Sequence, residues 1–267
     1  MIAVELRKLV RRPRTWVSIA LLVMLPTLVA IFVKVTHIGP RPGEGPPFLS
    51  AILSNGALFP AAALALVLPL FLPVAVAVIA GDAVAGEASA GTLRYLLVRP
   101  VGRTRLLVAK LVSVAVFVLL AVVIVAGTAY VVGVSLFGSQ PLPSVSGSTL
   151  STGQATFRTV VTVLYVGWSM LGVASVALFL STLTDSPLAA ALGALAALIT
   201  SQVLGALDAA AAIKPYLPTR YWLSFVDLFR DPVLWRDVDR GIALQAVYVV
   251  VLLGLTWANF TSKDITS

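Results

Sequence analysis

The residues that could do chemistry in this sequence gather in one polar stretch, residues 81–110. It reads GDAVAGEASAGTLRYLLVRPVGRTRLLVAK and separates two apolar runs, each long enough to cross a bilayer. Two carboxylates come first, Asp82 and Glu87. Five cations follow: Arg94, Arg99, Arg103, Arg105 and Lys110. These side chains suit ion pairing and recognition of a partner.

Catalysis and metal binding lack the residues that they need. His37 is the single histidine and cysteine is absent, so neither a metal-ligand cluster nor a Ser/His/Asp set can be assembled. Gly86 and Gly91 have the spacing of a phosphate-binding loop, but Thr92 and Leu93 follow where Lys and Ser or Thr are needed. We therefore expect no enzyme, and no cofactor or metal in this chain.

The composition indicates an integral membrane protein. Of the 267 residues, 59% are hydrophobic and only 11% are charged. The net charge of +8 is explained by cytoplasmic loops held on the negative side of the membrane, so it gives no reason to expect nucleic acid.

Hydropathy predicts an all-α membrane protein with one transmembrane domain over residues 1–267. The six predicted spans cover residues 15–33, 58–80, 106–134, 159–183, 187–207 and 242–260. Residues 1–14 place apolar side chains at helical spacing among arginines and predict an amphipathic helix on the cytoplasmic surface, with its cations available to lipid phosphates. Residues 81–105 are predicted to form a cytoplasmic loop. Residues 208–241, rich in charged and aromatic residues, predict short amphipathic helices at the external interface.

Two spans contain residues that point to bending or close packing. Pro60, Pro69 and Pro73 should kink or break the second span, and Pro69 and Pro73 are candidates for lining a path or for bent packing. In the fifth span, small residues recur four apart on one face, where another helix can approach closely: Ala189, Gly193 and Ala197.

Six spans place both termini on the same side. Lys and Arg number 11 in the segments on that side and 8 in the segments opposite. The excess predicts cytoplasmic termini.

The polar loop itself predicts a short helix over residues 92–99. Leu93, Leu96 and Leu97 share one face, and Pro100 marks the end. Gly91 would allow a sharp turn into this helix. Such a helix could insert into the groove of a partner protein or rest on lipid headgroups, and its own pattern leaves both readings open.

The string GEASAGTLRYLLVRPVGRTRLLVAK resembles the segment after the second span of type 2 ABC exporter permeases. The matching positions are Glu87, Gly91, Thr92, Leu93, Leu96, Leu97, Pro100, Arg103 and Lys110. The resemblance covers the whole chain, from the basic amphipathic start through six spans to a closing Phe260, Asp264 and Ile265, although the tail has fewer arginines than is usual.

This resemblance implies the type 2 ABC exporter fold and a permease that dimerises with an identical or homologous permease. The dimer would recruit two ABC ATPase subunits, which hold the ATP and Mg, and cargo would pass along the second and fifth spans. Residues 92–99 would be the coupling helix, with Glu87 orienting it by pairing with Arg94 or Arg103. The implied ATPase-coupling residues are Glu87, Gly91, Thr92, Leu93, Arg94, Tyr95, Leu96, Leu97, Arg99, Pro100 and Arg103.

The expected setting is the bacterial cytoplasmic membrane, and the expected cargo is hydrophobic or amphipathic, such as a drug, lipid or peptide. Two other functions stay open. The prolines of the second span fit an ion-coupled carrier, although ionisable residues deep inside the spans are nearly absent. The aromatic segment after Asp208 fits a membrane scaffold or assembly factor that transports nothing.

Overall fold

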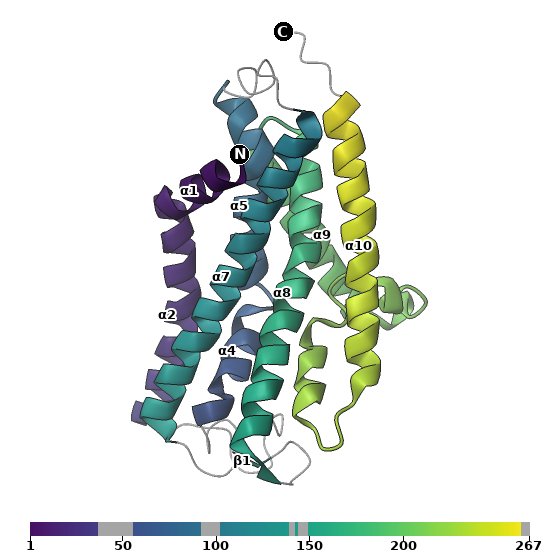
Figure 1. Cartoon of the computed structure of the whole chain (residues 1–267). Helices are drawn as coiled ribbons and strands as arrows, with labels where there is room; N and C mark the ends of the chain where they lie inside the picture. The colour runs from purple at the N-terminus through teal and green to yellow at the C-terminus, as the bar shows by residue number, and fades with distance from the viewer. Residues whose placement is uncertain (37–55, 92–101, 139–141, 144–148, 263–267) are drawn as a thin grey trace.

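The long helices run side by side in one bundle. The computed structural model describes residues 1–36, 56–91, 102–138, 142–143 and 149–262 (Figure 1). Within them, the strands are a two-residue antiparallel pair, β1 (Leu142–Pro143) and β2 (Thr149–Leu150). The N-terminal helix α1 lies at one end of the bundle, and β1 lies at the other. We call these the α1 end and the β1 end.

Six helices in the described ranges are long and apolar enough to cross a membrane, which confirms the predicted all-α architecture with six spans. They are α2 (Pro13–Thr36), α5 (Phe71–Ser89), α7 (Arg103–Phe137), α8 (Thr152–Leu183), α9 (Pro187–Ala206) and α10 (Trp235–Ser262). The helix α1 (Ile2–Arg11) precedes them. Most of these helices extend a few residues beyond the predicted spans, because polar residues at their ends continue the helical backbone.

The second span is broken rather than continuous over residues 58–80. A short 3₁₀ turn, η1 (Gly56–Leu58), leads into α4 (Phe59–Val67), and α5 begins only after a turn over residues 68–70. Pro60 lies in the first turn of α4 and Pro73 in the first turn of α5, positions where the missing N–H does no harm, while Pro69 lies in the turn itself. The carbonyl oxygen of Pro69 accepts a hydrogen bond from Gln202 Nε2 of α9 at 2.6 Å. A neighbouring helix thus satisfies backbone freed by the break.

The helix α5 continues past residue 80, where the cytoplasmic loop was expected to begin, and ends at Ser89. Asp82 and Glu87 are therefore helical and buried, instead of lying in a loop. The helix lies between α8 and α9, and its apolar residues join most of the described helices into one core. Near its end, Ser181 Oγ of α8 donates to Gly81 O at 2.6 Å and accepts from the backbone N–H groups of Val84 and Ala85.

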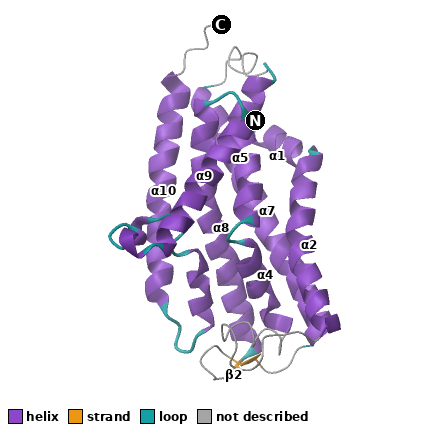
Figure 2. Cartoon of the chain, turned by 180° about the vertical axis from the view of Figure 1, so that it is seen from behind, coloured by secondary structure: helices purple, strands orange, loops and turns teal. Residues whose placement is uncertain are grey.

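The segment between α9 and α10 contains three 3₁₀ helices: η2 (Asp208–Ala210), η3 (Lys214–Tyr216) and η4 (Trp222–Phe229). Part of it projects from the side of the bundle about halfway along α10 (Figures 1 and 2). The hydroxyl of Tyr248, in the middle of α10, donates to Tyr216 O at 2.8 Å. This hydrogen bond holds the projecting segment beside the middle of α10. The following helix η4 turns back into the core and buries Phe225 and Phe229.

Candidate functional site

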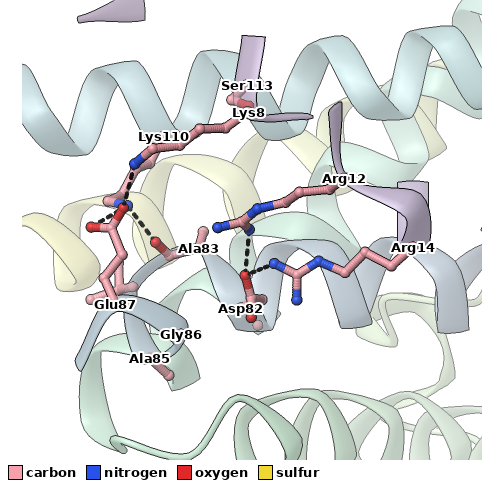
Figure 3. A network of polar contacts seen from close by, with 12 residues as sticks. Lys8, Arg12, Arg14, Asp82, Ala83, Ala85, Gly86, Glu87, Lys110 and Ser113 are labelled. Atoms are coloured by element: carbon pink, nitrogen blue, oxygen red, sulfur yellow. Dashed lines mark hydrogen bonds and ion pairs between the residues drawn. The ribbon is translucent and has the colours of Figure 1, made fainter. Parts of the chain in front are cut away.

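The α1 end carries a network of ion pairs that joins the N-terminal segment to α5 and α7 (Figure 3). The helix α1 is amphipathic, with Leu9 buried against the bundle and Arg7 and Arg11 exposed on its outer side. The cations on its inner side and just after it, Lys8, Arg12 and Arg14, reach toward α5. The N-terminal cations thus divide between ion pairs within the chain and the exposed surface.

Asp82 is shared by two arginines. Its Oδ2 lies 2.7 Å from Arg12 Nη1 and also pairs with Arg14 Nη2. The carboxylate side chain is only 11% exposed, whereas the two arginine side chains are 42% and 37% exposed. Asp82 therefore fixes the bend between α1 and α2 onto α5, while both guanidinium groups still reach solvent or headgroups.

Glu87 lies between two lysines from different helices. Lys8 Nζ is 3.2 Å from Oε1, and Lys110 Nζ of α7 is 2.8 Å from Oε2. Lys110 also donates to Ala83 O at 2.5 Å, and its side chain is only 2% exposed. Because an unpaired buried ammonium is very unfavourable, Glu87 and Ala83 O together make the position of Lys110 tolerable.

Lys8 keeps its charge over the whole neutral range. Burial lowers the pKa of Lys8, but the negative charges of Glu87 and Glu5 raise it by more, so that it lies above its ordinary value of 10.5. A raised pKa means that the stabilisation from this pair is fully present at neutral pH and is lost only as the pH rises through that pKa.

The glycine that precedes the predicted coupling helix is described. Gly91 has φ +66°, and its N–H donates to Ala88 O at 3.0 Å, so a left-handed glycine ends α5. The next described residue, Gly102, is the N-cap of α7. The predicted coupling residues between them lie outside the described ranges: Thr92, Leu93, Arg94, Tyr95, Leu96, Leu97, Arg99 and Pro100.

Both flanks of that segment are anchored to other helices. Arg103 Nη1 donates to Thr261 O of α10 at 2.7 Å, and Trp257 Nε1 of α10 donates to Thr104 Oγ1 at 3.0 Å. Phe260 packs in a small apolar cluster with Leu106 of α7 and other side chains from α5 and α8. The described ion-pair partners of Glu87 are Lys8 and Lys110. Arg94 lies outside the described ranges, so the pairing of Glu87 with Arg94 or Arg103 stays a prediction.

A cleft of about 800 Å³ opens beside this anchored flank. It lies between the N-terminus of α1 and the first turns of α7, and it is lined by Met1, Ile2, Ala3, Gly102, Thr104, Arg105 and Val108. Its walls are largely apolar, with Thr104 and Arg105 as the polar side chains among the described lining residues. A partner segment that carries apolar and acidic side chains would match this lining.

The other predicted positions lie away from this network. Pro73 is buried and Pro69 is exposed at the α4–α5 break. On α9, Ala189 and Ala197 are exposed and Gly193 is half-buried, whereas the buried face is formed by Ala190, Ala191, Ala194 and Leu198. The small-residue stripe is thus not the buried face of α9 within this chain, and it remains a candidate for contact with another molecule.

The Glu87–Lys110 pair was not expected as a pair, although both residues stand in the matched pattern. The pairing can be predicted once α5 is known to continue to Ser89. Glu87 of α5 and Lys110 of α7 then lie at the same end of the bundle. The contact of Ser181 with α5 has no comparable signal in the sequence. Among the residues that the structure describes, no group of three or more His, Cys, Asp or Glu side chains could hold a metal.

The described contacts tie the two flanks of residues 92–101 to the rest of the α1 end. The helix α5 ends just before Gly91, α7 begins after Gly102, and Glu87 of α5 pairs with Lys8 of α1. Ion pairs with little solvent access hold a fixed geometry better than exposed ones do.

Comparison with known proteins places the chain by family. No curated protein matches the sequence. One family model, described as "Protein of unknown function (DUF2705)", matches residues 27–266, which is most of the chain and includes all of α5 and α7–α10. The chain therefore belongs to the DUF2705 family, and its matched part carries Asp82, Glu87 and Lys110.

Proposed function

We propose that the chain is the membrane permease subunit of an ATP-binding cassette exporter of the type 2 class. Two permeases, identical or homologous, would form the path, and two separate ABC ATPase subunits would bind ATP and Mg and drive it. The chain itself would not be an enzyme. It would lie in a bacterial cytoplasmic membrane with both termini in the cytoplasm, and would export a hydrophobic or amphipathic molecule such as a drug, lipid or peptide.

The observation that carries this proposal is the resemblance of residues 87–110 to the coupling segment of that class. Glu87 and Lys110 stand at the first and last matching positions, 23 residues apart, and they form a buried ion pair at 2.8 Å. The pair closes the base of the segment that would receive the ATPase stroke. A motif whose two ends are joined in this way fits a rigid coupling element better than a helix that merely rests on lipid.

A second observation supports the second permease. The side chain of Asp208 is fully exposed, and that of Lys214, 3.2 Å away, is 21% exposed, on the segment that projects beside the middle of α10. Hydrocarbon solvates charged groups poorly, so this segment needs protein or water as its neighbour. The facing surface of another permease would supply either.

The first experiment is purification of the tagged chain from its native membrane in mild detergent, followed by mass spectrometry of the proteins that accompany it. We expect an ATPase with a phosphate-binding loop. Purification without such a subunit, under conditions that keep other transporter complexes intact, would contradict the proposal.

The coupling segment can be tested directly with Leu96→Asp combined with Leu97→Asp. Two carboxylates on the predicted apolar face should prevent docking, so we expect the ATPase to be lost from the purified complex while the permease stays in the membrane. The matched control, Leu96→Met with Leu97→Met, keeps the face apolar and should retain the ATPase. Full recovery of the ATPase with the aspartate variant would assign the docking to another surface.

The buried charges also favour a second candidate, an ion-coupled carrier that works alone. Asp82, Glu87 and Lys110 lie in helices, and groups of this kind often mark proton or ion paths. This candidate requires the purified chain, without any ATPase, to move substrate in liposomes under an ion gradient. ATP-dependent transport that needs the second subunit would exclude it.

A further inference from the structure

A wide groove opens on the side of the bundle toward the β1 end, away from the ion-pair network. Its volume is about 650 Å³, within the range of sites that hold drug-sized ligands. The helices α7 and α8 form its two walls. Its base is closed by Pro60 of α4 and Ala57 of η1. The lining residues are Ala57, Pro60, Val123, Ala126, Gly127, Tyr130, Ala155, Thr156, Thr159, Val160, Val163 and Leu164.

The groove arises from the sizes of these side chains. Small residues form its floor, and Pro60, Ala126 and Ala155 among them are buried. Larger side chains form its rims, with Val123 on α7 and Leu164 on α8 each more than half exposed. At Gly127 an added Cβ would meet nothing within 4 Å, so the space beside α7 is open.

The position of the groove selects a lipid as its occupant. Along α8 it extends from Ala155 to Leu164, about 13 Å at 1.5 Å per residue, which is close to the ~15 Å hydrocarbon depth of one leaflet. Its rims are continuous with apolar side chains exposed along the same helices, including Leu119 and Phe157. These surfaces face the bilayer in a chain whose helices span it.

The polarity of the lining matches one acyl chain with its headgroup toward the β1 end. None of the described lining residues is charged, so the described part of the groove offers no charged partner to an ion. The polar members, Tyr130, Thr156 and Thr159, lie near the β1 end of their helices, and the deeper positions are aliphatic. Tyrosine at such a level is typical of the membrane interface.

We infer that this groove is a binding site for a single acyl chain of a membrane lipid from the leaflet at the β1 end. The chain lies along α8 over the floor at Gly127, with its ester end beside Tyr130 and Thr156. The site is separate from the ion-pair network at the α1 end, and it does not depend on the proposed export function.

The test uses the purified full-length chain in nanodiscs that contain a phospholipid with a diazirine on one acyl chain. After illumination, mass spectrometry maps the adducts. We expect them to concentrate on residues 123–130 and 155–164. A diazirine near the glycerol should label the Tyr130 and Thr156 level, and one near the chain end should label the Val123 and Leu164 level.

Gly127→Phe fills the groove and should lower labelling of these segments about tenfold, equivalent to ~1.4 kcal/mol of binding free energy. Gly254→Phe is the matched control, because Gly254 is an exposed glycine of α10 at which an added Cβ also meets nothing within 4 Å. It should leave the labelling unchanged. If Gly127→Phe does not insert, Gly127→Leu is read in the same way.

Three results would overturn the inference. Labelling spread evenly over all lipid-facing helices would mean ordinary annular lipid. Groove labelling that survives the filled variant would place the lipid elsewhere. Cross-links between two copies of the chain at these residues, in place of lipid adducts, would assign the groove to a protein contact.

Discussion

At the scale of single residues, Lys110 depends on Glu87 more than any other described cation depends on its partner. Lys110 is 2% exposed, whereas Lys8, Arg12 and Arg14 each keep at least a third of the side chain exposed. Loss of Glu87 therefore leaves one ammonium that cannot turn toward water, while loss of Asp82 leaves two guanidinium groups that can.

We expect Glu87→Gln to destabilise the chain by about 3 kcal/mol, since it strands a buried charge. The measurement is thermal unfolding in detergent, followed by tryptophan fluorescence. Combining Glu87→Gln with Lys110→Met removes both charges and should restore most of the loss. A double variant no more stable than Glu87→Gln alone would contradict this explanation.

Asp237→Asn provides the control for removal of a carboxylate. Asp237 pairs with Arg240 at 3.7 Å, and both side chains are about half exposed. An exposed pair of this kind contributes little to stability. The unfolding midpoint of the Asp237→Asn variant should therefore stay close to that of the unmodified chain.

The sequence pattern placed Asp82, Glu87 and Lys110 in one polar stretch but assigned the N-terminal cations to lipid phosphates, so it did not predict their ion pairs with α5. It placed Asp82 and Glu87 in a loop, because two carboxylates within ten residues interrupt the apolar run. Tertiary packing overrides that pattern: ion pairs with Lys8, Arg12, Arg14 and Lys110 let the helix continue with buried charge. Ion pairs between residues about 70 to 80 positions apart leave no local signal.

At the scale of helices, glycine decides where α7 can approach its neighbours. A Cβ added at Gly133 would overlap Gly56 O and lie 2.6 Å from Phe59 Cβ, so the turn η1 and α7 meet backbone to backbone. Gly127, six residues earlier on the same helix, meets nothing. Two glycines of one helix therefore have opposite roles.

Gly133→Ala should cost about 2 kcal/mol or more of stability, since backbone atoms cannot move aside as a flexible side chain would. Gly127→Ala should be neutral or stabilising by up to about 1 kcal/mol, because alanine favours the helix. Thermal unfolding of the two variants side by side measures the difference. Equal stability of both would show that the close contact of α7 with η1 is not required.

The sequence predicted the helix break but not the bounds of the helices on either side of it. Three prolines between residues 60 and 73 indicated a kink or a break, and the chain does break at residues 68–70. As a consequence, the long helix does not cover residues 58–80 as predicted. It is Phe71–Ser89, and the preceding residues form α4, a short helix of nine residues. Hydropathy averages over such a turn because its residues are as apolar as their neighbours.

At the scale of the whole molecule, the distribution of Lys and Arg predicts cytoplasmic termini, and this prediction can be tested by cysteine labelling because the sequence has no cysteine. We expect Ser89→Cys, at the α1 end, to react with an impermeant maleimide only after the cells are opened. Arg236→Cys, near the start of α10, should react in intact cells. The reverse pattern would place the termini outside and remove the coupling segment from any cytoplasmic ATPase.

The projecting segment between α9 and α10 provides a test of pairing between permeases. If two copies meet at this segment, Ala209→Cys beside the exposed Asp208 should form an intermolecular disulfide in native membranes. Gly254→Cys, on the exposed surface of α10, is the control and should remain monomeric. If neither variant forms a disulfide, two copies do not meet at this segment. That result would favour a different permease as the partner, or water around the segment.

The turn over residues 68–70 interrupts the helix between α4 and α5, so any tilt of α5 relative to α4 would take place about this turn. From this turn to Glu87 the helix is about 26 Å long, so a tilt of roughly 5° would move Glu87 by about 2 Å. Because Glu87 is ion-paired to Lys8 and Lys110, α5 cannot swing as a free lever. A tilt of α5 would therefore have one of two consequences for the N-terminal helix α1. Either α1 moves together with α5, or the ion pair between Lys8 and Glu87 breaks.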